Sequence, residues 1–121
     1  MSDALGNPIQ FILTPGQDAN ISHAETLVGE HRPKAFLGDK GYDADHFLQF
    51  LNKNDIEPII PPRRSRTVQR LYDKNLYCDR NKIERIWNRL KHYRRIAIRY
   101  DKTARNYLSF VFLASTILWL L

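Results

Sequence analysis

Three short apolar segments, separated by segments of helical pattern, constrain the fold of this chain more than any other feature. The apolar segments are residues 9–13, 34–38 and 56–60, and each has a length typical of a strand. Residues 21–30 and 44–52, which lie between them, have the apolar spacing of short helices. Strand, helix, strand, helix, strand is the order typical of a parallel sheet with right-handed crossovers. The sequence therefore predicts an α/β fold with about three strands.

Two longer helices are predicted after the last strand, from about Asp79 to Ala97 and from about Thr103 to Leu121, which makes four helices in all. Residues 61–78, which precede them, form a polar, Arg-rich connection that we expect to be a mobile loop, ordered on binding nucleic acid. At the other end, residues 4–7 offer the chemistry of a hairpin turn with almost nothing before it. A sheet whose first strands are missing would explain this.

Short polar side chains next to the predicted helices are candidate caps, since their oxygens can accept from unpaired helical amides. Asp43 is expected to cap the helix over 44–52, and Asn20 or Ser22 the helix over 21–30.

Charge is distributed unevenly along the chain. Residues 61–106 hold 15 Lys/Arg and 4 Asp/Glu, a net charge of +11, whereas the remainder holds 4 and 9, a net charge of −5. A basic half joined to an acidic half suggests a face that binds a polyanion. The alternative is an ordinary solvated basic surface, and charge alone does not decide between them.

Several classes of protein are disfavoured. Cys78 is the single cysteine, and the four histidines are scattered without the spacing of a zinc site, so we expect a reducing, cytoplasmic compartment. The N-terminus has neither the basic nor the apolar region of a signal peptide. Residues 109–121 are uncharged but short for a bilayer span, which favours a buried helix over one sheet face, partly uncovered if the sheet is incomplete. A tail anchor or a dimer contact is the alternative.

Asp39 is the first candidate site residue. It follows a predicted buried strand, at the edge of an α/β sheet where ligands usually bind. Gly41 would permit a tight turn that leaves the Asp39 carboxylate exposed. The simpler interpretation is that Asp39 only stabilises the turn.

Glu84 is the second candidate. On a continuous helix, Arg80, Glu84, Lys91 and Arg95 would lie within roughly 60° of one another, beside an apolar stripe. Glu84 would then be a lone carboxylate on a cationic face, or simply the partner of Arg80 four residues earlier. Trp87 lies on the border of this face.

These residues form a recognisable pattern. The spacing Tyr77-x2-Arg80-x3-Glu84-x6-Lys91 is similar to the signature of a group of insertion-sequence DDE transposases. Asp39-Lys40-Gly41-Tyr42-Asp43 resembles the segment that holds the second catalytic aspartate of that family. Further similar stretches are Gly6-Asn7-Pro8, Thr14-Pro15-Gly16-Gln17 and Arg99-Tyr100-Asp101-Lys102. The resemblance therefore covers nearly the whole chain.

The resemblance implies a ribonuclease H-like fold in which two aspartates and a glutamate bind two divalent metals. It implies that Asp39 and Glu84 are catalytic and metal-binding, with Mg²⁺ or Mn²⁺ as the ion. It also implies DNA contacts around the scissile bond by Tyr77, Arg80 and Lys91. The other expected DNA contacts are non-specific ones to the backbone: Arg94, Arg95 and Arg99 first, then the cations of 63–70 and 85–105. Trp87 would either pack in the core or stack on an unpaired base.

The first aspartate of the family has no counterpart here, because Asp3 and Asp18 lie in turn-like segments. The chain, residues 1–121, is thus expected to be the C-terminal portion of one catalytic domain, with an incomplete ribonuclease H-like fold. It would be inert alone and would cleave and transfer strands only as part of the complete protein. Its expected partners are double-stranded DNA at transposon ends and either a second copy or the upstream half of the transposase, with no membrane. Two alternatives stay open: a catalytically dead DNA-binding relic, or a small basic membrane-surface or structural protein.

Overall fold

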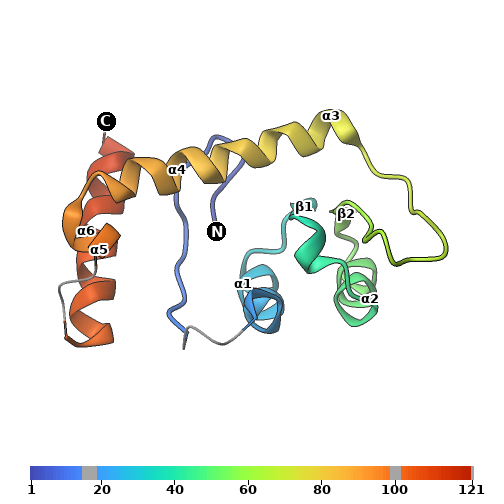
Figure 1. Cartoon of the computed structure of the whole chain (residues 1–121), viewed down its shortest axis with the longest axis horizontal. Coiled ribbons are helices and arrows are strands. Elements are labelled where there is room, and N and C mark those ends of the chain that lie inside the picture. The colour runs from blue at the N-terminus through green and yellow to red at the C-terminus, as the bar shows by residue number, and fades with distance from the viewer. Residues whose placement is uncertain (15–18, 99–101, 121) are drawn as a thin grey trace. The chain divides into compact units, whose positions relative to one another are not determined.

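The computed structural model describes residues 1–14, 19–98 and 102–120, which form two compact units (Figure 1). The strand unit comprises Gly16–Arg80, and the helical unit comprises Met1–Pro15 with Asn81–Leu121. The expected DNA contact Arg99 lies outside the described residues, as do parts of two stretches quoted for the resemblance, residues 15–17 and 99–101.

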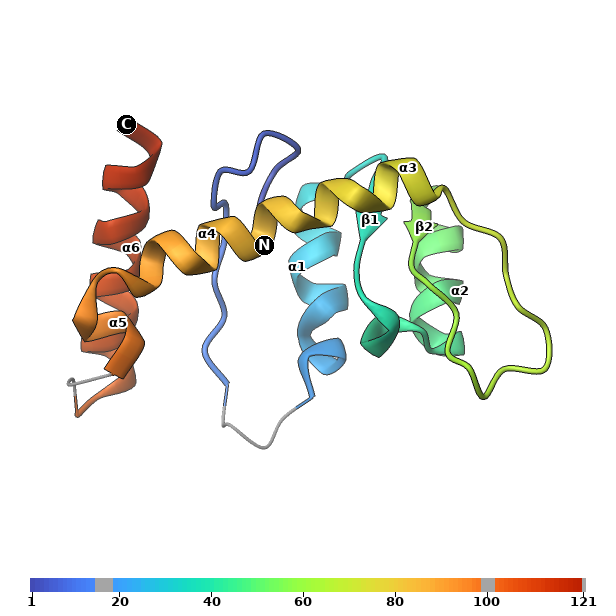
Figure 2. The ribbon, with the colours of Figure 1, turned by 45° about the horizontal axis from the view of Figure 1, so that its top comes forward.

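The strand unit is built on two parallel strands, β1 (Ala35–Leu37) and β2 (Glu57–Ile59), joined through the helix α2 (Asp45–Lys53) (Figure 2). Phe36 pairs with Pro58 in the register, and the ladder continues where Gly38 N–H donates to Ile59 O at 3.3 Å. The predicted strands at 34–38 and 56–60 and the crossover helix between them are therefore confirmed. The other elements of this unit are η1 (Asn20–His23), α1 (Ala24–His31), η2 (Lys40–Tyr42), α3 (Lys74–Tyr77) and η3 (Cys78–Arg80).

One hydrophobic core holds this unit together. Its fully buried members come from α1, α2 and the β2 segment: Ala24, Val28, Phe47, Leu51, Ile56 and Ile60. On α2, Phe47 and Leu51 are four residues apart and face the same side, as the apolar stripe of an amphipathic helix requires. The strand pair and its carboxyl end are thereby fixed against two helices.

The predicted strand at 9–13 is not formed. Near it, the described residues contain only a single antiparallel bridge between Ser2 and Pro8. The hairpin turn over 4–7 is present, with Gly6 at φ +88° and the Asp3 carboxylate accepting from the amides of Leu5 and Asn7. The segment after the turn packs through its side chains on helices, and Trp119 donates its indole N–H to Pro8 O at 2.6 Å.

The helical unit contains α4 (Asn81–Lys91), α5 (Arg94–Ile98) and α6 (Ala104–Leu120). The predicted single helix over 79–97 is wrong, because the chain is interrupted after Lys91. There the amides of His92 and Tyr93 bond to carbonyls three residues back, at 3.2 and 3.0 Å, which tightens the last turn of α4 before α5 starts. The fully buried members of this unit's core are Ile86, Leu90, Ile96, Val111 and Ala114.

The last helix is partly buried and partly exposed. The buried residues of α6 are Val111, Ala114 and Ser115, and the first two pack in the core that α6 forms with α4 and α5. The apolar residues that stay exposed along it are Phe112, Leu113, Ile117, Trp119 and Leu120. Among the described residues, no helix combines the length and apolar character needed to cross a membrane.

The predicted side-chain caps are not formed. The first turn of α2 follows Ala44 and has no side-chain cap, and neither η1 nor α1 has one. Ser22 instead donates its hydroxyl to Ala19 O at 2.6 Å.

Candidate active site

Asp39 lies at the carboxyl end of β1, directly before η2. Its Oδ1 accepts from Gly41 N–H at 2.9 Å, so its side chain does stabilise the turn. Even so, 48% of that side chain remains exposed. The turn therefore presents the carboxylate to solvent at the sheet edge, and the two interpretations of Asp39 are compatible.

Two glycines make this turn possible. A Cβ on the buried Gly38 would lie 2.7 Å from Phe36 Cε1 and 2.9 Å from Tyr42 Cδ2, because the Tyr42 ring packs back over the strand end. A Cβ on Gly41 would lie 2.8 Å from Asp39 Oδ1. Gly41 is thus needed because the Asp39 carboxylate occupies the space of its side chain.

The pKa of the Tyr42 phenol is affected by the charge of the Asp39 carboxylate. Burial raises the pKa of the Tyr42 phenol, and the negative charge of Asp39 raises it further, whereas Arg80 acts in the opposite direction. The ring is held against Phe36 and Phe47, with centroid distances of 5.4 and 6.1 Å. Tyr42 thus anchors the turn to the core.

Arg80, which belongs to the motif that begins at Tyr77, contacts the Asp39 carboxylate. Its Nη2 lies 3.4 Å from Asp39 Oδ2, across 41 residues of sequence. The helical segment that carries Arg80 begins at Asp73, whose carboxylate caps α3 by accepting from Leu76 N–H. Tyr77, in the same segment, packs edge-on against Tyr72 at a centroid distance of 5.7 Å.

An open cavity of about 620 Å³ lies beside Asp39 in the strand unit. It is lined by Asp39, Lys40, Gly41, Arg63, Arg64 and Ser65. Three cations and one carboxylate line it, so an anionic group is the ligand that its charge favours.

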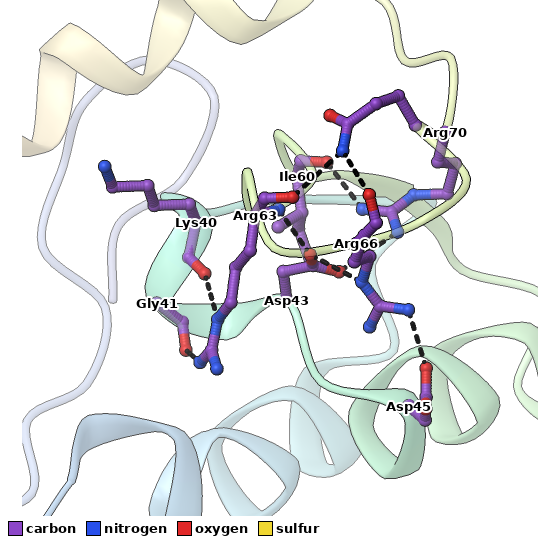
Figure 3. A network of polar contacts seen from close by, with 9 residues as sticks. Lys40, Gly41, Asp43, Asp45, Ile60, Arg63, Arg66 and Arg70 are labelled. Atoms are coloured by element: carbon purple, nitrogen blue, oxygen red, sulfur yellow. Dashed lines mark hydrogen bonds and ion pairs between the residues drawn. The ribbon is translucent and has the colours of Figure 1, made fainter.

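Asp43 is a functional candidate that the sequence reasoning missed. It is 2% exposed, and its carboxylate accepts from Arg63 N–H at 2.6 Å, Arg66 Nε at 2.7 Å and Arg70 Nη1 at 3.1 Å (Figure 3). We call Asp43 with these three arginines the Asp43 cluster. Burial alone would raise the pKa of the Asp43 carboxyl, but these hydrogen bonds outweigh it and hold the pKa below its usual value.

The same arginines fold the Arg-rich connection onto the strand unit, where a mobile loop was predicted. Arg63 donates from Nε to Lys40 O and from Nη2 to Gly41 O, at 3.1 and 3.2 Å. Arg70 donates to Ile60 O at 2.7 Å, and Arg66 also pairs with Asp45. No local pattern signals these contacts, because the partners of Asp43 lie 20 to 27 residues further along the chain.

Glu84 and Lys91 lie on α4 in the helical unit, and both are exposed. They are seven residues apart and therefore share a face of that helix. The predicted face of four residues is not continuous over all four, because Arg95 lies beyond the interruption after Lys91.

The remaining candidates of the helical unit lie on α4 and α5. Trp87 packs edge-on against Phe11 at 6.1 Å and remains 41% exposed. The Arg95 guanidinium lies 4.9 Å from the centroid of the Phe110 ring, and Arg94 is exposed. Packing thus accounts for part of the Trp87 and Arg95 surfaces.

The oxygen atoms of both candidate carboxylates are donors of the kind that a hard divalent cation prefers. The Asp39 carboxylate is half exposed beside an open cavity, and Glu84 is an exposed carboxylate on a helix. Within the described ranges, neither unit gathers three His, Cys, Asp or Glu side chains into a metal-binding group.

Comparison with known proteins identifies the class. Residues 36–121, which include both motifs, match the family described as the transposase DDE domain. A Brucella ovis protein described as a transposase for insertion sequence element IS6501 is 36% identical over 122 residues, covering 98% of this chain and 92% of that protein. A Burkholderia cepacia protein described as a transposase for IS402 is 28% identical over 116 residues, covering 86% of this chain and 53% of that protein. No solved structure matches the chain.

The chain belongs to the insertion-sequence DDE transposases. Transposases of this class act on DNA at the ends of the element, and they generally use divalent metals. The chain spans about half the length of its Burkholderia relative.

Proposed function

We propose that residues 1–121 are the C-terminal portion of one DDE catalytic domain with an incomplete ribonuclease H-like fold. In the complete protein this domain cleaves and transfers DNA strands at the ends of an insertion sequence. The observation that carries the proposal is the contact between Asp39 and Arg80, at 3.4 Å. This contact joins a residue of the Asp39–Asp43 motif to a residue of the motif that runs from Tyr77 to Lys91. If either motif matched the family by chance, no contact between them would be expected.

Asp39 and Glu84 are the proposed metal ligands, with Mg²⁺ or Mn²⁺ as the ion. Two such ions would neutralise the phosphodiester and its leaving oxygen and would favour the ionised nucleophile. Gly41 N–H and Arg80 donate to the Asp39 carboxylate and orient it at the sheet edge.

The proposed DNA contacts are cationic or aromatic. Arg80 and Lys91 would bind phosphates beside the two carboxylates, and Tyr77 would flank them. Arg94, Arg95 and Arg99 would bind the backbone without reading sequence. The partners are double-stranded transposon ends together with a second copy or the upstream half of the transposase.

A chimera that joins the first half of the IS402 transposase to this chain tests the proposal. We expect Mg²⁺-dependent cleavage of IS402 terminal DNA, and Asp39→Asn or Glu84→Gln should abolish it, because each removes a proposed metal ligand. Asp55→Asn and Glu57→Gln are matched controls. Both residues are exposed, and the φ of 57° at Asp55 suits Asn. Full activity in either test variant would refute the assignment.

A DNA-binding relic without activity is the second candidate, favoured by the net charge of +11 over residues 61–106. This candidate predicts that the chain binds DNA in a salt-sensitive way and that Glu84→Gln leaves this binding unchanged. It also predicts that the chimera does not cleave DNA. A membrane-surface protein, favoured by the exposed apolar residues of α6, would instead partition onto anionic vesicles in preference to DNA.

A further inference from the structure

We propose that the Asp43 cluster is a positioning device that divides the loop cations into two groups. Arg66 and Arg70 are structural, and they hold residues 63–65 as one wall of the Asp39 cavity. Arg64 and Lys40 are the cations that bind a DNA phosphate there. The second half of this inference rests on the proposed function.

The cluster has the properties of a fixed anchor. The Asp43 side chain is 0% exposed and has donors on both oxygens, whereas the Arg66 and Arg70 side chains are each 27% exposed. Buried charge-assisted hydrogen bonds are short and directional, so they fix the backbone that carries them. The shortest bond joins Asp43 directly to the backbone, at Arg63 N–H.

This anchor places the cavity wall. Arg63 is bound to Asp43 through its amide and to the Lys40 and Gly41 carbonyls through its guanidinium. The wall residues Arg63–Ser65 and the turn that presents Asp39 are therefore tied together from both sides (Figure 3). Movement of Asp43 would move both.

The cations that remain for a ligand are few. Both Lys40 and Arg64 are exposed and line the cavity, and within the described part of the chain their charged groups make no ion pair. The Lys40 side chain points away from the cluster (Figure 3). Arg66 and Arg70, in contrast, already use their guanidinium groups on Asp43, Asp45 and Ile60 O. A phosphodiester beside Asp39 would consequently meet Lys40 and Arg64.

Hydrogen exchange on the free chain tests the anchor without DNA. In Asp43→Ala we expect the Arg63 amide to exchange at least 10-fold faster, while the Leu48 amide in α2 is unchanged. If the alanine variant fails to fold, Asp43→Asn replaces it. Asn keeps one acceptor oxygen, so we expect a smaller increase in the exchange rate of the Arg63 amide. Asp45→Asn is the matched control, because its side chain is 81% exposed and pairs with the same arginine. Unchanged exchange at Arg63 in both Asp43 variants would overturn the anchor.

The salt dependence of duplex binding tests the division of cations. Each lost phosphate contact lowers the slope of log K against log salt concentration by about 0.9. We expect that decrease for Arg64→Gln and Lys40→Gln, and an unchanged slope for Arg66→Gln and for the exposed control Lys53→Gln.

Equal loss of slope in Arg66→Gln and Arg64→Gln would overturn the division. If the unmodified chain shows no salt-dependent DNA binding, the proposed function and the phosphate site both fail. The exchange of Arg63 still decides whether the anchor exists.

Discussion

Asp39 and Asp43 are two aspartates four residues apart in one turn, and their carboxylates lie in opposite environments. The Asp39 side chain is 48% exposed and receives a backbone amide and one long contact from Arg80. Asp43 is buried, and three donors saturate it. A carboxylate that must bind a metal needs open coordination positions, whereas one that organises a loop needs none, so the environments separate the two roles.

Gly41→Ala should damage the site without unfolding the chain. The new Cβ would lie 2.8 Å from Asp39 Oδ1 and would displace the carboxylate, and a shift of about 1 Å at a reacting group can cost about 100-fold in rate. We expect at least a 10-fold loss of cleavage in the chimera. Gly29→Ala is the control, since its Cβ would meet only Phe50 Cζ at an ordinary 3.8 Å. Unimpaired cleavage by Gly41→Ala would contradict the proposed position of Asp39.

The Asp43 cluster should make stability depend on acid pH. The folded pKa of Asp43 is lowered, so its contribution is complete above the unfolded pKa of about 3.9 and is lost as pH falls through the folded value. We expect Asp43→Asn to lower the unfolding free energy by about 2 kcal/mol at pH 7, from weakened hydrogen bonds to a charged group. In urea titrations at pH 7, 5 and 3, the difference between wild type and variant should be constant between pH 7 and 5 and shrink at pH 3. A difference that grew on acidification would contradict this.

The elements that the sequence predicted well are those set by local pattern. The strand–helix–strand core was predictable because apolar runs and the Phe47/Leu51 spacing are local, and Asp39 followed from its place after a strand. The interruption after Lys91 was not, because apolar residues continue with helical spacing on both sides of it. The Asp43 cluster could not be predicted from local sequence either, because it forms only when loop residues 20 to 27 positions away fold back onto Asp43.

Phe11 is the residue of the N-terminal segment whose ring packs on the helices of the helical unit. Phe11 packs edge-on against both Trp87 and Phe112, with centroids 6.1 Å away in each case. Phe11→Ala should destabilise this unit by about 1–3 kcal/mol, below the cost at a fully buried phenylalanine. Hydrogen exchange should quicken in α4 and α6 while α2 is unaffected. Leu5→Ala, at an 84% exposed position, should change neither, and equal effects of the two variants would contradict the assigned packing.

At the scale of the whole molecule, the two proposed catalytic carboxylates belong to different compact units. Asp39 is fixed in the strand unit by its turn, and Glu84 is carried by α4 of the helical unit. In its described part, neither unit gathers three His, Cys, Asp or Glu side chains into a metal-binding group. Shared metal binding is consequently the claim on which the transposase mechanism of this chain depends.

Paramagnetic broadening by Mn²⁺ in nuclear magnetic resonance spectra tests that claim most directly, because the effect reaches only amides near the bound ion. In the chimera that carries the first half of the IS402 transposase, substoichiometric Mn²⁺ should broaden the amides around both Gly41 and Glu84. Asp39→Asn and Glu84→Gln should each remove the broadening at both places, since one site uses both carboxylates. If Asp39→Asn abolished broadening only around Gly41 and left it intact around Glu84, the two carboxylates would bind separate ions and the account would be contradicted.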